Sequence, residues 1–318
     1  MKNFRNALGT YKNGNYTVNI LTDGTKIRFS EDDEFIPEFA ENCDVKITDK
    51  CDGGCPFCYE GCTIKGQHAK LMNPDGTPYW NFLNTLKPYT ELALNGNDLS
   101  HPELEDFLKF LKTKKIITNM TVNQKHFMKN LKLLHRWTDE KLIYGLGVSL
   151  ADASDIKFKE EILKFPNAVI HTIAGLLDTH DVYNLLVNAE KKLKILILGY
   201  KTLERGIGYA QEFSETIKSN QEWLKTMIKC NSLIDHFKVV SFDNLALDQL
   251  DIKNILFAGK ENEWDLFYSG DDGSMTYYID MVKGQYSKNS CMPKEERYEI
   301  GNQSVTEMFN DIRNKYNK

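Results

Sequence analysis

The sequence predicts an α/β fold, a partial (βα)6 barrel of the TIM type with an N-terminal β-hairpin and a mixed C-terminal extension. Three observations predict this architecture. Segments typical of strands and helices alternate between residues 43 and 245, the pattern of βαβ units around a parallel sheet. A hairpin pattern precedes this region, and the alternation ends after it. The chain has 318 residues, 41% of them hydrophobic, and can therefore bury a core of this size.

Residues 1–42 form the predicted N-terminal extension. Two runs in which apolar and polar residues alternate, at residues 16–21 and 26–29, flank the dipeptide Asp23-Gly24. An Asp-Gly pair between such runs is typical of a tight turn, because glycine adopts the positive φ that the turn needs. We therefore expect a β-hairpin here.

Residues 43–245 form the predicted barrel. Its first strand, at residues 44–48, ends just before a group of cysteines. We expect the later strands at residues 91–94, 120–122, 143–150, 168–174, 194–198 and 237–242. We expect the helices between them at residues 102–112, 127–137, 155–164, 180–191 and 214–228. Crossover helices of this length are what parallel neighbouring strands need.

Residues 246–318 form the predicted C-terminal extension, a hairpin followed by a terminal helix. Segments 265–269 and 275–282 flank Gly270-Asp271-Asp272-Gly273, a turn-forming sequence that predicts the hairpin. Residues 302–318 are expected to form the helix. Ser304 is its candidate N-cap, and Glu307 completes a capping box.

The composition narrows the classes of function. The formal net charge is -5, from 40 basic and 45 acidic residues, which argues against a nucleic-acid-binding surface. No stretch approaches the roughly 20 apolar residues of a membrane span, and no secretory signal is evident, so we expect a soluble cytoplasmic protein. Of the seven cysteines, four lie between residues 51 and 62. In a reducing compartment this spacing indicates metal binding or redox chemistry.

Three cysteines follow the first predicted strand on one loop, Cys51, Cys55 and Cys58, in the pattern C-x3-C-x2-C. Glycines and a proline between them favour a sharply bending loop on which the sulfurs can converge on one cluster. Three thiolates leave one iron with an open position, as catalytic zinc sites keep one ligand position open. The alternative is a non-enzymatic, zinc-stabilised binding protein in which Cys62 supplies a fourth thiolate.

This motif, with the aromatic Phe57 before its third cysteine and its place after the first strand, resembles the radical S-adenosylmethionine (SAM) superfamily. The resemblance covers the predicted barrel. It implies a [4Fe-4S] cluster bound by the three cysteines, with Phe57 and Tyr59 near the adenine of SAM. It also implies reductive cleavage of SAM to a 5′-deoxyadenosyl radical that abstracts hydrogen from a substrate. An electron donor of the flavodoxin or ferredoxin type would then be a partner.

The segment Asn95-Gly96-Asn97-Asp98, after the second predicted strand, is similar to the Gly-Gly-Glu-Pro segment of the family, which binds the amino group of SAM. Asn97 takes the place of the Glu. Its carbonyl oxygen accepts a hydrogen bond without a full charge, so we expect a weaker contact, and Asp98 is the candidate for the missing charge. The alternative is that the segment is only a turn and an N-cap for the next helix.

The ends of the next three strands extend the resemblance. Asn123 lies where the family often carries Thr-Asn-Gly, and Ser149 lies where a polar residue commonly meets the ribose or carboxylate of SAM. Ile173, two residues after His171, resembles the isoleucine of an adenine-packing Gly-x-Ile-x-Gly pattern. The alternatives are structural polar residues for the first two, and places in the core for Ile173 and His171.

The loop after the sixth strand carries Tyr200, Lys201 and Arg205. We expect them near the substrate, because barrel sites form at the carboxyl ends of the strands; the alternative is a solvated loop. We expect the substrate to be a peptide or protein side chain, with a nucleotide or other small metabolite as the alternative. Cys230 and Cys291 are either idle thiols or hydrogen-atom donors. The sequence assigns no role to Cys43.

Overall fold

The computed structural model describes residues 7–31, 34–95, 99, 101–186, 192–231, 233–268 and 270–316. Its N-terminal part is an antiparallel sheet of β1 (Ala7–Asn13), β2 (Tyr16–Leu21) and β3 (Lys26–Phe29). The predicted hairpin is β2–β3 and is confirmed. The additional strand β1 joins it through a turn at Gly14, whose φ of +60° suits glycine.

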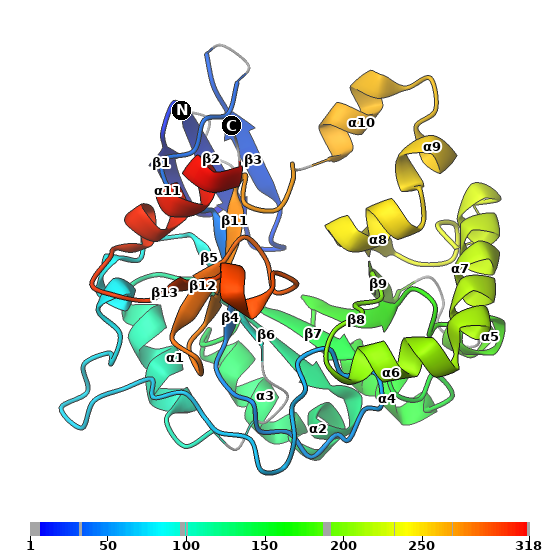
Figure 1. The fold of residues 1–318 in the computed structure, drawn as a ribbon, viewed down its shortest axis with the longest axis horizontal. Coiled ribbons are helices and arrows are strands. Elements are labelled where there is room, and N and C mark those ends of the chain that lie inside the picture. The colour runs from blue at the N-terminus through cyan, green and yellow to red at the C-terminus, as the bar shows by residue number, and fades with distance from the viewer. Residues whose placement is uncertain are drawn as a thin grey trace.

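A second, ten-stranded sheet forms the centre of the molecule, in the order β10-β9-β8-β7-β6-β5-β4-β11-β12-β13 (Figure 1). Strands β4 to β10 run parallel, and β11 lies parallel to β4 on its other side. The strands are β4 (Asn42–Lys46), β5 (Glu91–Asn95), β6 (Ile117–Asn123), β7 (Gly145–Ser149), β8 (Ala168–Ile173), β9 (Lys194–Leu198), β10 (Val239–Phe242), β11 (Thr276–Asp280), β12 (Gln285–Ser287) and β13 (Tyr298–Glu299).

The predicted α/β class with a large parallel sheet is confirmed. The sheet is not closed, however, because β10 and β13 are its two edges in the described part of the chain. A (βα)6 barrel in the strict sense is therefore not what the structure shows. The parallel series continues past six strands into β10, and the C-terminal extension adds β11 to the other side of β4.

The helices are α1 (Leu104–Thr113), α2 (Gln124–Lys129), α3 (Leu131–Asp139), α4 (Ile156–Ile162), α5 (Thr179–Leu186), α6 (Arg205–Glu212), α7 (Ser214–Lys229), α8 (Asn244–Gln249), α9 (Ile252–Leu256), α10 (Glu261–Phe267) and α11 (Val305–Tyr316), with the 3₁₀ helices η1 (Asn81–Thr85) and η2 (Lys294–Glu296). Figure 1 shows α1 to α5 and α7 along the outer side of the curved sheet. Among the described helices, none is both long and apolar enough to cross a membrane.

Two predictions about the C-terminal extension have different outcomes. The hairpin around residues 270–273 is wrong, because residues 261–267 form α10; the actual hairpin is β11–β12. The terminal helix and its capping box are confirmed. Glu307 accepts from the backbone N–H of Ser304 (2.7 Å), and its own N–H donates to the Ser304 Oγ (3.2 Å).

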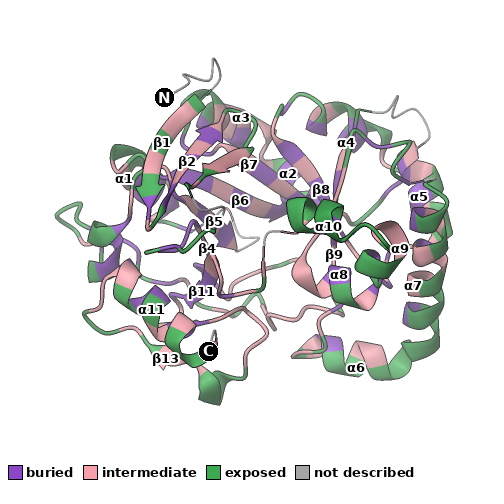
Figure 2. Cartoon of the chain, turned by 90° about the horizontal axis from the view of Figure 1, so that it is seen from above, coloured by how far each residue is buried: buried purple, intermediate pink, exposed green. Residues whose placement is uncertain are grey.

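The parallel strands alternate between two environments, which Figure 2 shows as alternating colours along them. Residues such as Val45, Leu94 and Val148 are fully buried under the helices. Their neighbours along each strand point to the concave side and are less buried. We call this concave side the lumen face; it is lined by Asp44, Ala93, Asn119, Gly147 and His171.

Candidate functional site

The motif cysteines lie on the cysteine loop (residues 51–62), which follows β4 at the carboxyl ends of the parallel strands. The backbone N–H of Gly53 donates to the Sγ of Cys51 (3.3 Å). A Cβ added to Gly53 would lie 3.2 Å from the Cys51 sulfur and 3.7 Å from the Cys55 sulfur. Gly54 has φ +64°, which suits glycine. The two glycines thus let the chain bend while both sulfurs stay close to one point.

Cys58, the third cysteine of the motif, contacts Cys62. A hydrogen bond from the Cys62 thiol lowers the pKa of Cys58 to about 6, and the same contact raises the pKa of Cys62. The contact thus favours the thiolate form of Cys58 and the protonated form of Cys62. Among the described residues, no three His, Cys, Asp or Glu side chains converge as ligands of a single metal ion. The donor set fits a cluster that takes one thiolate per iron, with Cys62 beside it.

Charged side chains hold the cysteine loop on two sides. Arg205, the first residue of α6, donates from Nε to the carbonyl oxygen of Cys55 and from Nη2 to that of Cys62, both at 3.0 Å. On another side, the Asp52 carboxylate pairs with Nε2 of His126 in α2. This hydrogen bond lowers the pKa of Asp52. The loop is thus tied to helices that follow two different strands.

Buried ion pairs join the cysteine loop to the C-terminal extension. The Nζ of Lys46, at the end of β4, lies 2.6 Å from Asp49, 2.7 Å from Glu60 and 3.8 Å from Asp280 of β11. Arg297 lies 3.6 Å from the same Asp280 carboxylate. Because charges this deep are costly without partners, each side chain of the network constrains the others.

Asp44 places a carboxylate at the centre of the lumen face. Its side chain is accessible to water although protein surrounds it, as expected in a concave lumen. Burial raises the pKa of Asp44 to about 6; the nearby Lys201 ammonium opposes this shift, and Asp272 and Asp243 add to it. Asp44 therefore has two other carboxylates nearby, Asp243 and Asp272, and Lys201 as their cationic neighbour.

His171 of β8 also lies on the lumen face. A Cβ added to Gly147 of the neighbouring β7 would lie 2.2 Å from the imidazole ring, so the missing side chain there makes room for it. Burial lowers the pKa of His171 to about 4. The imidazole is therefore neutral at neutral pH and can accept or donate one hydrogen bond.

The residues predicted from the later strands lie at the carboxyl ends of the parallel strands, where the cysteine loop also lies. The last residues of β5, β6, β7 and β8 are Asn95, Asn123, Ser149 and Ile173. Asn123 is the register partner of Ser149, and its side chain accepts from the N–H of Lys125 (2.8 Å) as the N-cap of α2. Contacts of these residues with SAM stay predictions.

Gly96, Asn97 and Asp98 lie outside the described residues. Just after them, two side chains of the predicted helix start fix the segment that follows the cysteine loop. His101 Nε2 lies 3.0 Å from the Ala69 carbonyl oxygen. Glu103 accepts from the N–H groups of Leu71 (2.6 Å) and Met72 (3.0 Å). These contacts place the start of α1 against the chain that leaves the site.

The two aromatic residues of the cysteine loop face α6 and the segment before it. Phe57 packs edge to face on Tyr209 of α6, with 5.8 Å between ring centroids. The Nζ of Lys201 lies 4.1 Å from the ring centroid of Tyr59, a cation–π contact. Contact of either ring with an adenine stays a prediction.

The three residues expected near the substrate make contacts within the protein. Tyr200 is buried, and its hydroxyl donates to the Gly206 carbonyl oxygen (2.8 Å). The Nζ of Lys201 donates to the Ser290 Oγ (3.0 Å), and Arg205 holds the cysteine loop. Lys201 faces the lumen carboxylates, whereas Tyr200 supports the turn into α6. Their contact with a substrate stays a prediction.

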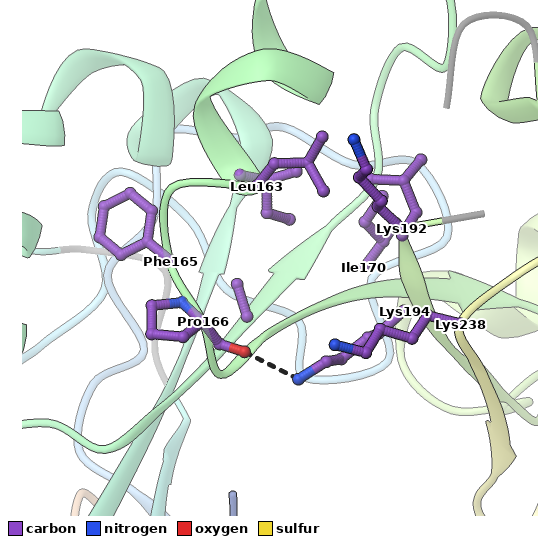
Figure 3. Close-up of a pocket in the computed structure, with 10 residues that line it drawn as sticks. Leu163, Phe165, Pro166, Ile170, Lys192, Lys194 and Lys238 are labelled. Atoms are coloured by element: carbon purple, nitrogen blue, oxygen red, sulfur yellow. Dashed lines mark hydrogen bonds between the residues drawn. The ribbon is translucent and has the colours of Figure 1, made fainter. Parts of the chain in front are cut away.

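Two cavities lie away from the cysteine loop. One of about 270 Å³ is open at the amino-terminal ends of β8 and β9, between Leu163, Pro166 and the lysines 192, 194 and 238 (Figure 3). Lys194 donates there to the Pro166 carbonyl oxygen (2.8 Å). Because it lies at the other end of the strands, it is separate from the cysteine loop. A second cavity, of about 510 Å³, lies beside α8 and α10 and includes Asp272.

The fold of the chain, with its large parallel sheet, can be compared with known proteins. No protein-family model and no curated protein sequence matches the chain. Among solved structures, native anSMEcpe with bound AdoMet and the Cp18Cys peptide has a TM-score of 0.51 at 12% identity, covering 87% of this chain and 81% of that one.

Streptococcus suis SuiB is a second structural neighbour. Its complex with S-adenosylmethionine has a TM-score of 0.52 at 13% identity, covering 86% of this chain and 64% of that one. Its complex with the precursor peptide SuiA has a TM-score of 0.52 at 12% identity, covering 87% and 67%. The chain thus spans about two thirds of SuiB. At this identity the likeness establishes the fold, which agrees with the resemblance stated from the motif.

Sequence reasoning missed Asp44, the Lys46 ion pairs and the Asp52–His126 pair. Asp44 and Lys46 had a detectable pattern, because polar residues alternate with apolar ones along β4 although the strand lies in the middle of a sheet. A central strand with a polar face indicates a solvated lumen. The Asp52–His126 pair had no such pattern, since the two residues are far apart in the chain.

Proposed function

We propose that the chain is a radical SAM enzyme that modifies a side chain of a peptide or protein. The observation that carries the proposal is the cysteine loop at the carboxyl end of β4, in a fold shared with SAM-bound enzymes. We assign Cys51, Cys55 and Cys58 as the ligands of a [4Fe-4S] cluster. Once bound, the cluster and SAM would supply a 5′-deoxyadenosyl radical that abstracts hydrogen from a C–H bond.

In this proposal the chain binds SAM along the carboxyl edge of β5 to β8. Asn95 and residues 96–98 receive the amino group, and the polar ends of β6 and β7 receive the ribose or carboxylate. Ile173 packs on the adenine with the aromatic residues of the cysteine loop. The position of Asn123, Ser149 and Ile173 at one edge supports this assignment. The lumen face then receives the reacting part of the substrate and excludes water from it.

A peptide is the favoured substrate because two structural neighbours were solved with peptides, Cp18Cys and SuiA. The open sheet supports this choice, since β10 and β13 do not close the lumen in the described part of the chain. A nucleotide or other small metabolite is the alternative. Reduction of the cluster would come from a donor of the flavodoxin or ferredoxin type.

SAM cleavage tests the proposal directly. Protein purified without oxygen should be brown, with broad absorption near about 400 nm, and after reduction should release 5′-deoxyadenosine from SAM. Cys55→Ala should abolish this release, because one iron loses its thiolate. Cys230→Ala is the matched control, since Cys230 is exposed and outside the loop. Release of 5′-deoxyadenosine by the Cys55→Ala variant would show the cluster assignment to be wrong.

The second candidate, a zinc-stabilised binding protein, is favoured by one observation, the contact between Cys62 and Cys58. Substitution Cys62→Ser separates the two candidates. A cluster held by three cysteines should keep its iron and sulfide in this variant, measured by metal and sulfide analysis. A four-thiolate zinc site should lose metal affinity strongly. Stoichiometric zinc without iron in the wild type would establish the second candidate.

A further inference from the structure

Arg205 bridges two carbonyl groups of the cysteine loop, one on each side of Cys58. Its Nε donates to Cys55 and its Nη2 to Cys62, both at 3.0 Å. A guanidinium offers several donors in a fixed plane and stays charged at all accessible pH values, so it can hold two acceptors at a constant separation. The ends of the segment 55–62 are thereby fixed relative to each other.

The residue directly before Arg205 has a strained backbone. Glu204 has φ 47° and ψ -124°, a backbone conformation unfavourable for a residue with a side chain. Its carboxylate lies 2.9 Å from the Nζ of Lys294 and packs beside Gly61, where an added Cβ would lie 3.2 Å from it. Such strain persists only where surrounding contacts maintain it.

The first turn of α6 approaches the cysteine loop closely. A Cβ added to Gly206 would lie 2.5 Å from the Lys201 carbonyl oxygen and 3.5 Å from that of Phe57. Phe57 also packs against Tyr209 one turn later. Backbone contact, ring packing and the two Arg205 hydrogen bonds therefore act between the same pair of segments.

We propose that Arg205 is a positioning residue that holds the cysteine loop in the conformation that receives the cluster, before any cluster is present. This inference rests on the proposed function only for the identity of the cluster. The loop conformation itself is a property of the cluster-free chain. A lysine at this position would keep the charge but could not bridge both carbonyl groups.

Hydrogen exchange of the metal-free protein tests the proposal without any cofactor. In Arg205→Ala, backbone amides of residues 51–66 should exchange about tenfold faster, because two charge-assisted hydrogen bonds are lost. The exchange rates in Arg205→Lys should lie between those of Arg205→Ala and those of the wild type. The control is Arg136→Ala on α3, which removes an exposed arginine paired with Glu105. Unchanged exchange of the loop in Arg205→Ala would overturn the proposal.

Iron release to a chelator gives the second readout. The reconstituted Arg205→Ala protein should lose iron about tenfold faster than the wild type and show an altered electron paramagnetic resonance spectrum of the reduced cluster. Arg205→Lys should restore part of both properties. If the wild type takes up no iron-sulfur cluster, the proposed function fails, and the exchange measurement still decides the role of Arg205. If the Arg205→Ala protein released iron at the wild-type rate, the positioning role of Arg205 would be contradicted.

Discussion

Asp44 and its neighbours show how the residues of the lumen face work against stability. Among the described residues, the charged groups that most affect the titration of Asp44 are two carboxylates, Asp243 and Asp272, and one cation, Lys201. Lys201 is itself engaged with the Tyr59 ring and Ser290. An acidic, water-accessible group in such a place is expensive to keep charged. Carboxyl groups with pKa values raised in this way are common at functional sites.

The substitution Asp44→Asn should therefore stabilise the metal-free protein in a pH-dependent way. The pKa of Asp44 is raised from 3.8 to about 6 by burial, so stability falls as pH rises through this range, where the unfolded carboxyl ionises first. The shift sets an upper limit of about 3 kcal/mol, which water in the lumen reduces to about 1 kcal/mol. The variant should be more stable than the wild type by about this amount above pH 7, and the gain should vanish below pH 4.

Urea unfolding at pH 4 and pH 8 measures this gain. Asp106→Asn on α1 is the control, because its side chain is 75% exposed. At pH 8 it should not reproduce the stabilisation expected of Asp44→Asn. An Asp44→Asn variant whose stability relative to the wild type does not change with pH would contradict the position assigned to this carboxylate.

The residues of the site divide by how local their interactions are. That Cys51, Cys55 and Cys58 share one loop after a strand could be predicted, because their spacing and the glycines between them are contained in one short segment. Strand-end residues such as Asn123 could be placed at the correct edge because parallel strands share one direction. Arg205 was predicted near a substrate, whereas its observed contacts are with Cys55 and Cys62. Such long-range side-chain bonds leave no periodic pattern.

At the scale of elements, the neighbouring strands β7 and β8 are close enough that the His171 ring of β8 occupies the space over Gly147 of β7. Gly147→Ala should push the His171 ring from its place, because the new Cβ would lie 2.2 Å from it. Overpacking of this kind costs about 1–3 kcal/mol. Gly208→Ala in α6 is the matched control, since an added Cβ there meets nothing within 4 Å, and it should stabilise by about 0.5–1 kcal/mol.

Thermal unfolding of both glycine variants measures the difference. We expect a lower melting temperature for Gly147→Ala and an equal or higher one for Gly208→Ala. A pH scan adds a readout for the imidazole, because displacement into water should return the pKa of His171 from about 4 toward its ordinary value. Equal melting temperatures for Gly147→Ala and the wild type would refute the close contact of the two strands.

Elements with a clear period were predictable, and those fixed by tertiary contacts were not. Strand β9 was found because Lys194–Leu198 contains a short apolar run. Helix α6 was missed because two glycines in Arg205–Glu212 weaken its helical propensity, and contacts with the cysteine loop compensate. Residues 265–269 were predicted as a strand, but 265–267 belong to α10, in which Trp264 and Phe267 are three residues apart and pack on one helical face.

At the scale of the whole molecule, the C-terminal extension is part of the central sheet. Strand β11 pairs with β4 over Thr276–Asp280, and Tyr277 and Ile279 are buried in the main core. Helix α11 packs Met308 and Phe309 against the same core. The boundary predicted at residue 246 therefore separates two sequence patterns that share one hydrophobic core.

A chain ending at residue 256, after α9, should consequently fail to give a folded monomer. Without β11, one side of β4 would have no neighbouring strand beside the cysteine loop. Lys46 would also lose its partner Asp280. Size-exclusion chromatography and circular dichroism should show aggregated or largely unfolded protein. A chain ending at residue 316 should behave like the full chain, because it keeps every described element. A monomeric, cooperatively unfolding 1–256 chain would instead establish the extension as an independent domain, and β4 would then be an edge strand that tolerates exposure.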